Sequence, residues 1–484
     1  MSALDPRTGI VTRLDHGTSH AVLHTATADL AATDGHALPL GNQVVGGTSW
    51  TSPERAAQRA LGEAVERYAG HLIDPRRLRR ATAAALGPSA VPLDAFALYR
   101  PDQLTRPGFP FTGFDPIAER LWIQSTHPTP LWLPASLTWL PPGPHTQEFP
   151  SSRAGSRTPE GPSPHTQEFP SSRAGSRTPE GPGPHAGEFS SSRAGSSRPG
   201  GPGSRARGSA DASGGVVHLP VGAGIAAGPT FAQARESALA EVVERHALAT
   251  AWYRGDRFPE LPRQAVPEPV GAELTWYAVP NLLGAPVVAC AARSAAGIAL
   301  GCALTPGAAD PVATSARKAA AEALLSLDAI AAVADGVPEW SAVLHPVRAD
   351  RRYADSYRPD LSDATDLVCT LQLLADPRMT DAIATRLAKG DDRNTRHPDP
   401  APHWPPPGDR GGWRPDPVDL DSASRAVGLT PLTVDLSPAD LPGWCCARVL
   451  VPGLRSVGPA AFPFLGDGVE PLPPGPPSLP LPHV

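Results

Sequence analysis

Two stretches far apart in the sequence share one pattern: RALGEAVERY from Arg59 to Tyr68 and SALAEVVERH from Ser237 to His246. Both contain two glutamates three residues apart, with an arginine directly after the second. At about 100° per residue, the three charged side chains of each stretch lie on one side of an α-helix, with apolar side chains opposite. Each helix therefore presents two carboxylates and one guanidinium on a single polar face.

The paired charges suggest a metal–nucleotide site. A solvated amphipathic helix held by ion pairs would explain either stretch alone, but two surface faces have no reason to match residue by residue. If the two faces meet, their carboxylates repel each other unless cations bridge them. Magnesium commonly joins one or two carboxylates to phosphate oxygens, which arginine can clamp in bidentate fashion. The charged residues are Glu63, Glu66 and Arg67 in the first stretch and Glu241, Glu244 and Arg245 in the second.

Capping signals predict where both helices begin. Thr51 and Glu54 have the spacing of a capping box, which predicts a helix starting near Ser52. Thr230 and Gln233 have the same spacing before the second stretch. We therefore expect both charged stretches to lie within helices.

A glycine-spaced loop and a third helix extend this pattern. The loop GAGIAAG (222–228) runs directly into the second helix, where backbone amides can approach an anion. The sequence has no GxxxxGK[ST] motif, so a P-loop is not expected. A third helix is predicted from Asp310 and carries Lys318 and Glu322. These two residues form an i,i+4 pair, for which a purely structural role is the alternative.

Alternating helical and strand-like patterns predict an α/β or α+β fold. They run from Thr8 to Leu140 and again from Val216 to Leu327. Within the second part, PVVACAA and GIALGCAL are interpreted as a buried strand pair joined near Ser294. We expect mixed sheets with packed helices.

A repeat with a period of 20 residues separates the two parts. PHTQEFPSSRAGSRTPEGPS starts at Pro144, recurs at Pro164 and degenerates at Pro184. Each unit has one Phe and no apolar periodicity, so it cannot bury enough surface to offset the entropy of ordering. We expect a disordered insert, with a polyproline-type recognition arm as the alternative. The predicted divisions are residues 1–140 and 216–470 for the two parts of one domain, 141–215 for the insert and 471–484 for a proline-rich tail.

Composition argues against several classes of protein. The formal net charge is −6, and Lys318 and Lys389 are the only lysines, so no basic surface indicates a nucleic-acid partner. We find neither a secretory h-region nor an apolar stretch that would span a bilayer. The five cysteines form no CxxC pair, and an odd number of them fits reduced thiols. We expect a cytoplasmic protein without a membrane or nucleic-acid partner.

These motifs resemble the YcaO family, and more narrowly its azoline-forming peptide cyclodehydratases. SPERAAQRALGEAVERYAG (52–70) resembles the family's first ATP/magnesium helix, and GIAAGPTFAQARESALAEVVERHALATAW (224–252) resembles its second. ARKAAAEALLSL (316–327) is similar to the third helix and LTVDLSPADLPGWCCARVLVPGL (432–454) to the late strands. The resemblance covers most of the chain outside residues 141–215 and implies a YcaO-like ATP-binding fold, interrupted by the insert.

The resemblance implies ATP and Mg²⁺ as cofactors. Family cyclodehydratases use a Cys, Ser or Thr side chain to attack the preceding amide carbon of a ribosomally made peptide. ATP then activates the resulting oxyanion, and phosphate leaves as the thiazoline or oxazoline ring closes. No residue is assigned as a catalytic acid or base. By resemblance, magnesium would be held by Glu63, Glu66, Glu241 and Glu244, and the nucleotide contacted by Arg67, Arg245 and Glu322.

Several positions depart from the family pattern. The chain has Gly46–Ser49 where the family often has Gly-Lys-Gly, and Arg59 and His246 replace a Ser and an Asp. Leu324 and Leu325 stand where a Gln is often found. Two alternatives to ring formation therefore stay open. One is backbone thioamidation at the same ATP site, and the other is an inactive scaffold that binds the precursor peptide.

The expected partners are a precursor peptide and a separate leader-peptide-binding protein, because no leader-binding domain is apparent ahead of Thr8. A homodimer is compatible with the sequence. The tail PLPPGPPSLPLPHV (471–484) partly matches the PxPxP tail of azoline-forming members. It continues past Pro482 to His483 and Val484, so a solvated tail is the alternative to one that approaches the active site.

Overall fold

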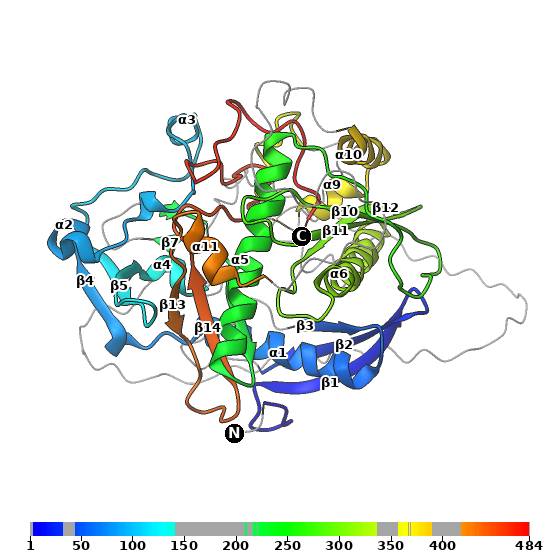
Figure 1. Ribbon diagram of the computed structural model, residues 1–484, viewed down its shortest axis with the longest axis horizontal. Helices are drawn as coiled ribbons and strands as arrows, with labels where there is room; N and C mark the ends of the chain where they lie inside the picture. The colour runs from blue at the N-terminus through cyan, green and yellow to red at the C-terminus, as the bar shows by residue number, and fades with distance from the viewer. Residues whose placement is uncertain are drawn as a thin grey trace, which may run out of the picture. The chain divides into compact units, whose positions relative to one another are not determined.

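The computed structural model describes residues 3–31, 44–140, 209–210, 216–219, 221–335, 357–365, 367, 369–389 and 418–483. They belong to one compact unit built from Met1–Gln147 and Ser204–Val484 (Figure 1). The expected disordered insert lies outside the described residues, apart from 209–210 near its end. These two residues form β7 (Ser209–Ala210), which pairs with β8 (Val216–His218).

An N-terminal sheet supports the first charged helix. Its antiparallel strands have the order β1-β2-β3, and α1 packs against all three. Gly47 allows the close approach, because a Cβ atom at this position would lie 2.2 Å from the Ala56 carbonyl oxygen. The elements are β1 (Val11–Ser19), β2 (Leu23–Leu30), β3 (Val44–Ser49) and α1 (Pro53–His71).

A second sheet, in the order β10-β11-β12, is packed against α6. β11 and β12 form the predicted hairpin, in which Ser294 pairs with Gly297. Every residue of β12 is buried, which explains why this strand is continuously apolar or small instead of alternating. The elements are β10 (Glu273–Ala278), β11 (Val288–Ser294), β12 (Gly297–Ala303) and α6 (Pro311–Ala334).

A third sheet, in the order β13-β14-β9, joins the middle of the chain to its C-terminal part. The second charged helix, α5, packs on β9 and β14 and also touches β12 (Figure 1). This helix is therefore buried on several sides, in contrast to the solvated amphipathic alternative. The elements are β9 (Ile225–Gly228), α5 (Phe231–Arg254), β13 (Leu432–Asp435) and β14 (Cys445–Leu450).

The three long helices begin where the sequence predicts. Thr230 accepts a hydrogen bond from the amide three residues later in α5, and Asp310 does the same in α6. In α1 the start is confirmed, but the capping residue is Ser52 rather than Thr51. The Thr51 hydroxyl instead lies 3.0 Å from the Ser49 hydroxyl.

Smaller elements complete the described part. A fourth antiparallel sheet has the order β4-β5-β6. Mixed helices and small antiparallel sheets confirm the predicted fold class in its α+β form. Within the described ranges, no helix combines the length and apolarity needed to cross a membrane. The elements are β4 (Leu78–Ala81), β5 (Arg120–Gln124), β6 (Trp132–Pro134), α2 (Ala83–Leu86), α3 (Pro101–Leu104), α4 (Ala135–Thr138), α9 (Cys369–Leu374), α10 (Pro377–Lys389) and α11 (Leu420–Ala426).

Candidate active site

The two charged helices meet at one backbone segment, residues 224–227. The Ala227 amide donates to Glu66 Oε1 of α1 at 2.9 Å, and the Gly224 amide donates to Glu241 Oε2 of α5 at 2.9 Å. Burial raises the pKa of Glu66 well above its usual range, and the facing carboxylates of Glu63 and Glu241 raise it further. The structure therefore brings carboxylates of both helices together.

Arg448 binds the loop that carries these amides, on the side opposite the glutamates. Its guanidinium donates to the carbonyl oxygens of Val221, Gly222 and Ala223, and burial lowers its pKa to about 10. Gly224 has a φ of +93°, and a Cβ there would lie 2.5 Å from the Val449 carbonyl oxygen. Arg448 binds the loop carbonyl oxygens on one side, and Gly224 adopts the left-handed conformation that glycine favours. Together these features turn the loop amides toward the glutamates.

Arg67 is paired within its own helix. Its Nη2 and Nε atoms lie 2.8 and 2.9 Å from Glu63 Oε1, and both side chains are about one-third exposed. Arg245 has a different environment, because its Nη2 lies 3.8 Å from Glu241 Oε1 and its Nη1 lies 3.5 Å from Glu244 Oε1. The carboxylates of Glu244 and Glu241 outweigh burial and raise the pKa of Arg245, so this guanidinium is charged.

Glu244 is the most enclosed carboxylate of the site, with a side chain that is 1% exposed. Its Oε2 accepts a hydrogen bond of 3.0 Å from the Leu304 amide and lies 3.6 Å from Lys318 Nζ. Burial raises the pKa of Glu244 to about 7, although Lys318 and Arg245 oppose this rise. The environment therefore disfavours the ionised form of Glu244 relative to the protonated form.

Lys318 and Glu322 of α6 complete the cluster. Lys318 Nζ lies 3.7 Å from Glu322 Oε1 as well as close to Glu244, and Glu244 is the main cause of the raised pKa of Lys318. The sequence pattern predicted Lys318 only as a partner of Glu322, and its place beside the second charged helix was not predicted. A usable signal was present, because Lys318 is one of only two lysines in an arginine-rich chain.

The edge of β12 orders this side of the site. Within the described sheet, β12 is an edge strand that pairs only with β11. Amides along its unpaired edge therefore bind groups outside the sheet. The Cys302 amide donates to Glu322 Oε2 at 3.4 Å, and the Leu304 amide binds Glu244. The Leu300 amide donates to the Pro482 carbonyl oxygen at 3.1 Å, and His483 Nδ1 lies 3.0 Å from the Leu300 carbonyl oxygen. The proline-rich tail is thus docked beside the charged cluster.

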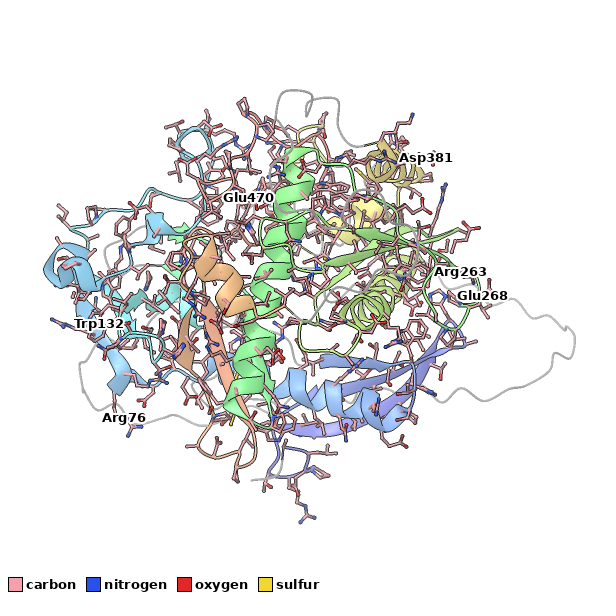
Figure 2. All side chains as sticks on the ribbon, in the orientation of Figure 1. Arg76, Trp132, Arg263, Glu268, Asp381 and Glu470 are labelled. Atoms are coloured by element: carbon pink, nitrogen blue, oxygen red, sulfur yellow. The ribbon has the colours of Figure 1, made fainter. Side chains whose placement is uncertain are left out.

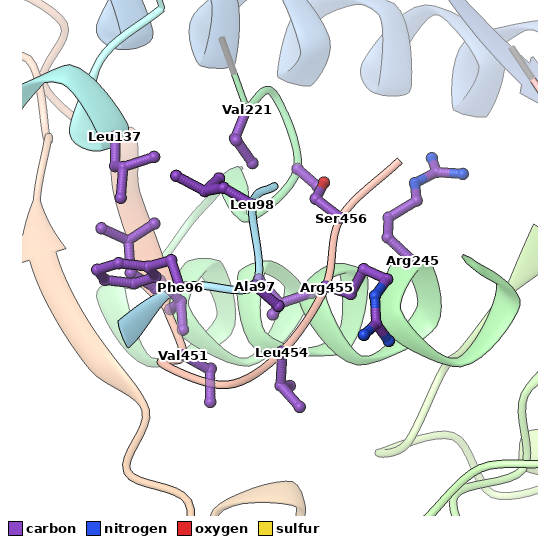
Figure 3. Close-up of a pocket in the computed structure, with 14 residues that line it drawn as sticks. Phe96, Ala97, Leu98, Leu137, Val221, Arg245, Val451, Leu454, Arg455 and Ser456 are labelled. Atoms are coloured by element: carbon purple, nitrogen blue, oxygen red, sulfur yellow. The ribbon is translucent and has the colours of Figure 1, made fainter. Parts of the chain in front are cut away.

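A cavity of about 40 Å³ adjoins the cluster. Figure 3 shows Phe96, Leu98 and Leu454 on its apolar wall, with Arg245 at the side away from Phe96. Arg245 therefore lies between the carboxylates and a small apolar space.

The cluster suits a magnesium–polyphosphate ligand. Five carboxylates face three cationic groups, so the site has an excess of negative charge when all are ionised. Among the described residues, no three His, Cys, Asp or Glu side chains form a group that could hold a metal alone. Magnesium does not require such a cage, because it usually keeps water and phosphate oxygens in its shell. Glu244 Oε1 and Arg245 Nη1 are buried and lie 3.5 Å apart as an ion pair, but neither has a hydrogen-bond partner among the described residues.

Comparison with known proteins identifies the fold. A family model described as YcaO cyclodehydratase, ATP- and Mg²⁺-binding, matches residues 49–157 and 210–455. A comparison with curated protein sequences found no match. A solved heterocyclase in complex with substrate and cofactor superposes with a TM-score of 0.57 at 18% identity, over 94% of this chain and 51% of that chain. The chain thus spans about half the length of that heterocyclase.

Two further solved structures resemble this chain more weakly. YcaO from Methanopyrus kandleri bound with AMPPCP and Mg²⁺ has a TM-score of 0.47 at 15% identity, over 92% of this chain and 86% of that chain. The E. coli microcin synthetase McbBCD complex has a TM-score of 0.47 at 9% identity, over 91% of this chain and 88% of that chain. Since the family model alone matches well over half of the sequence, the chain belongs to the YcaO family of ATP- and Mg²⁺-binding cyclodehydratases.

Proposed function

We propose that this protein is an ATP-dependent cyclodehydratase that closes azoline rings in a ribosomally made peptide. The observation that carries the proposal is the meeting of two ExxER helices on residues 224–227, with carboxylates in excess over cationic groups. Such a site suits chemistry in which positioning and charge neutralisation at phosphate do most of the work.

We assign the residues of the cluster to two tasks. The carboxylates would hold magnesium, which would supply charge neutralisation at the phosphates. Arg67, Arg245 and Glu322 contact the nucleotide. Support for Arg245 comes from its buried Nη1 atom, which has an ion pair with Glu244 at 3.5 Å but no hydrogen-bond partner among the described residues. A phosphate oxygen would supply that hydrogen bond. The carboxylates assigned to magnesium are Glu63, Glu66, Glu241 and Glu244.

The proposed reaction removes one water equivalent for each ring. A Cys, Ser or Thr side chain adds to the preceding amide carbon and loses its proton, which leaves the amide oxygen as an oxyanion. The oxyanion takes the γ-phosphoryl group of ATP, and ADP is released. The amide nitrogen then loses its proton as the carbon–nitrogen double bond forms and phosphate departs with the former amide oxygen.

The recruiting partner is part of the proposal. We propose that a separate protein, which binds the leader of the precursor peptide, delivers the substrate. The free thiols of Cys290, Cys302 and Cys446 fit a reducing, cytoplasmic location.

Product mass tests this function. The protein is incubated with ATP, Mg²⁺ and the peptide encoded beside its gene, together with any leader-binding protein encoded there. Ring formation lowers the peptide mass by one water per ring, whereas thioamidation exchanges oxygen for sulfur and raises it. Glu63→Gln with Glu241→Gln is the inactive control. ATP consumption with an unchanged or heavier peptide would overturn ring formation, and the absence of any ATP turnover would leave only the scaffold.

A further inference from the structure

We propose that Glu470 is a positioning residue, which together with His246 and Arg254 of α5 seats the tail so that its end stays paired with β12. This inference rests on the proposed function for its consequence in catalysis. Glu470 lies beyond residue 455, where the family match ends. Figure 2 shows it beside α5, the helix that also carries Glu241, Glu244 and Arg245.

Glu470 is held by two side chains of α5. Its Oε2 lies 3.0 Å from His246 Nε2, and its Oε1 accepts a hydrogen bond of 2.7 Å from Arg254 Nη1. The three side chains are 12%, 1% and 10% exposed, respectively. Arg254 also pairs with Asp256 at 2.7 Å. The carboxylate therefore lies in a nearly closed, fully paired environment.

The hydrogen bonds fix the tautomer of His246. The Arg455 amide donates to His246 Nδ1 at 2.9 Å, so this nitrogen is the acceptor. Nε2 must then carry the proton that is donated to Glu470. The Arg455 guanidinium in turn donates to the Glu470 carbonyl oxygen at 3.3 Å and to the Thr250 hydroxyl at 2.8 Å. The side chain of Glu470 is thus bound to α5 directly, and its backbone is bound to α5 through Arg455.

The tail that follows Glu470 is held along its length through its carbonyl groups. Proline has no N–H group, so a proline-rich segment forms backbone hydrogen bonds mainly where donors reach its oxygens. Arg100 donates to the carbonyl oxygens of Pro473 and Gly475 at 2.9 Å each. Trp252 Nε1 donates to the Leu479 carbonyl oxygen at 3.3 Å, and the Leu300 amide then binds Pro482. The tail is therefore held by a few discrete donors together with Leu481, which packs in the hydrophobic core.

Seating brings the tail's end to the charged cluster. Leu300 and Cys302 of β12, and Leu304 directly after the strand, direct their amides to Pro482, Glu322 and Glu244. The tail thus occupies the next position along the edge that orders two carboxylates of the site. Burial, and then the nearby charge of Arg245, lowers the pKa of His483.

A buried ion pair contributes little to the free energy of unfolding, because the desolvation of both charges offsets much of their attraction. Its advantage is geometric, since two charged hydrogen bonds fix one arrangement of the carboxylate. Both anchors of Glu470 lie on α5, and His246 directly follows Arg245. The arrangement therefore ties the start of the tail to the same rigid helix that carries the proposed nucleotide ligands.

Hydrogen exchange at Leu300 tests the proposal directly. Its amide is protected by Pro482 of the tail, whereas the Leu304 amide is protected by Glu244 and serves as an internal control. In Glu470→Ala we expect exchange at Leu300 to rise about tenfold or more, because the variant loses both charge-assisted hydrogen bonds of Glu470, with Leu304 unchanged. Glu470→Gln should show a smaller rise, because its amide oxygen can still accept from His246. The matched control is Asp467→Asn, which removes the charge of an exposed neighbour.

Arg100→Ala provides a second variant outside the buried cluster, in case Glu470→Ala does not fold. It should also raise Leu300 exchange, because it frees the carbonyl groups of Pro473 and Gly475. In both variants we expect kcat for the peptide to fall while the Kd for Mg–ATP stays the same. Wild-type exchange at Leu300 in the folded variants would overturn the proposal, as would faster exchange with unchanged peptide conversion. If wild-type protein modifies no peptide, the proposed reaction fails, but the exchange result still decides whether Glu470 seats the tail.

Discussion

Replacing Glu244 by Gln should stabilise the ligand-free protein while weakening Mg–ATP binding. The Glu244 side chain is 1% exposed, and burial raises its pKa from the usual 4.5 to about 7. A rise of this size corresponds to ~3 kcal/mol of free energy that the folded state loses when the carboxyl ionises. Gln keeps the acceptor for the Leu304 amide and removes the charge that causes this loss.

The sign of the pH dependence follows from the raised pKa. Below the pKa that Glu244 has in the unfolded chain, its carboxyl is protonated in both the folded and the unfolded state. Its ionisation then contributes nothing to the free energy of unfolding. Between the two pKa values the unfolded state releases its proton first, so wild-type stability falls as pH rises. The gain from Glu244→Gln should therefore be close to zero at about pH 4.5 and approach its full size at about pH 8.

Urea denaturation with EDTA at these two pH values measures the effect as a difference in the free energy of unfolding. Glu236→Gln, an exposed substitution on the same helix, is the control and should change nothing. Calorimetry with Mg–ATP at the higher pH should show weaker binding only for Glu244→Gln. The reasoning is refuted if this variant is no more stable than wild type at the higher pH, or if its gain is independent of pH.

Three further outcomes are expected. Deleting residues 144–203 should leave the melting temperature and ATP binding nearly unchanged, because the repeats have no apolar periodicity with which to pack; a loss of many degrees would contradict this. Removing residues 479–484 should abolish ring formation but not ATP binding, and a truncated protein that converts precursor at the full rate would leave the tail without a catalytic role. Gly224→Ala should destabilise the fold by about 1–3 kcal/mol and weaken Mg–ATP binding, because φ is +93° there and its amide positions Glu241; normal binding would show that the loop is not needed.

The sequence predicted best those features that depend on neighbouring residues, such as helix caps and a hairpin turn. Thr230 and Asp310 are capping residues recognisable from spacing alone, and the hairpin at Ser294 follows from two apolar runs around a short polar turn. The cap of α1 was wrongly placed at Thr51, because two neighbouring hydroxyl residues compete and only Ser52 reaches the Arg55 amide. Single-residue shifts of this kind depend on local backbone angles that spacing does not determine.

Long-range features were not predictable from the pattern. That Glu66 and Glu241 share one loop depends on β9 pairing with β14, some two hundred residues later in the chain. The duplicated motif suggested that the faces meet, but nothing in it indicated Arg448 behind the loop. The place of Lys318 beside Glu244 likewise follows from how α6 packs against β12, which periodicity cannot specify.

Isothermal titration calorimetry of ATP with Mg²⁺ tests the central assignment most directly. The comparison is between wild-type protein and the variants Glu63→Gln and Glu241→Gln, each with an unchanged circular dichroism spectrum. If the carboxylates of the two helices hold the metal–nucleotide, binding to wild type should require Mg²⁺ and fall sharply in both variants. Undiminished binding in both folded variants would contradict the assignment.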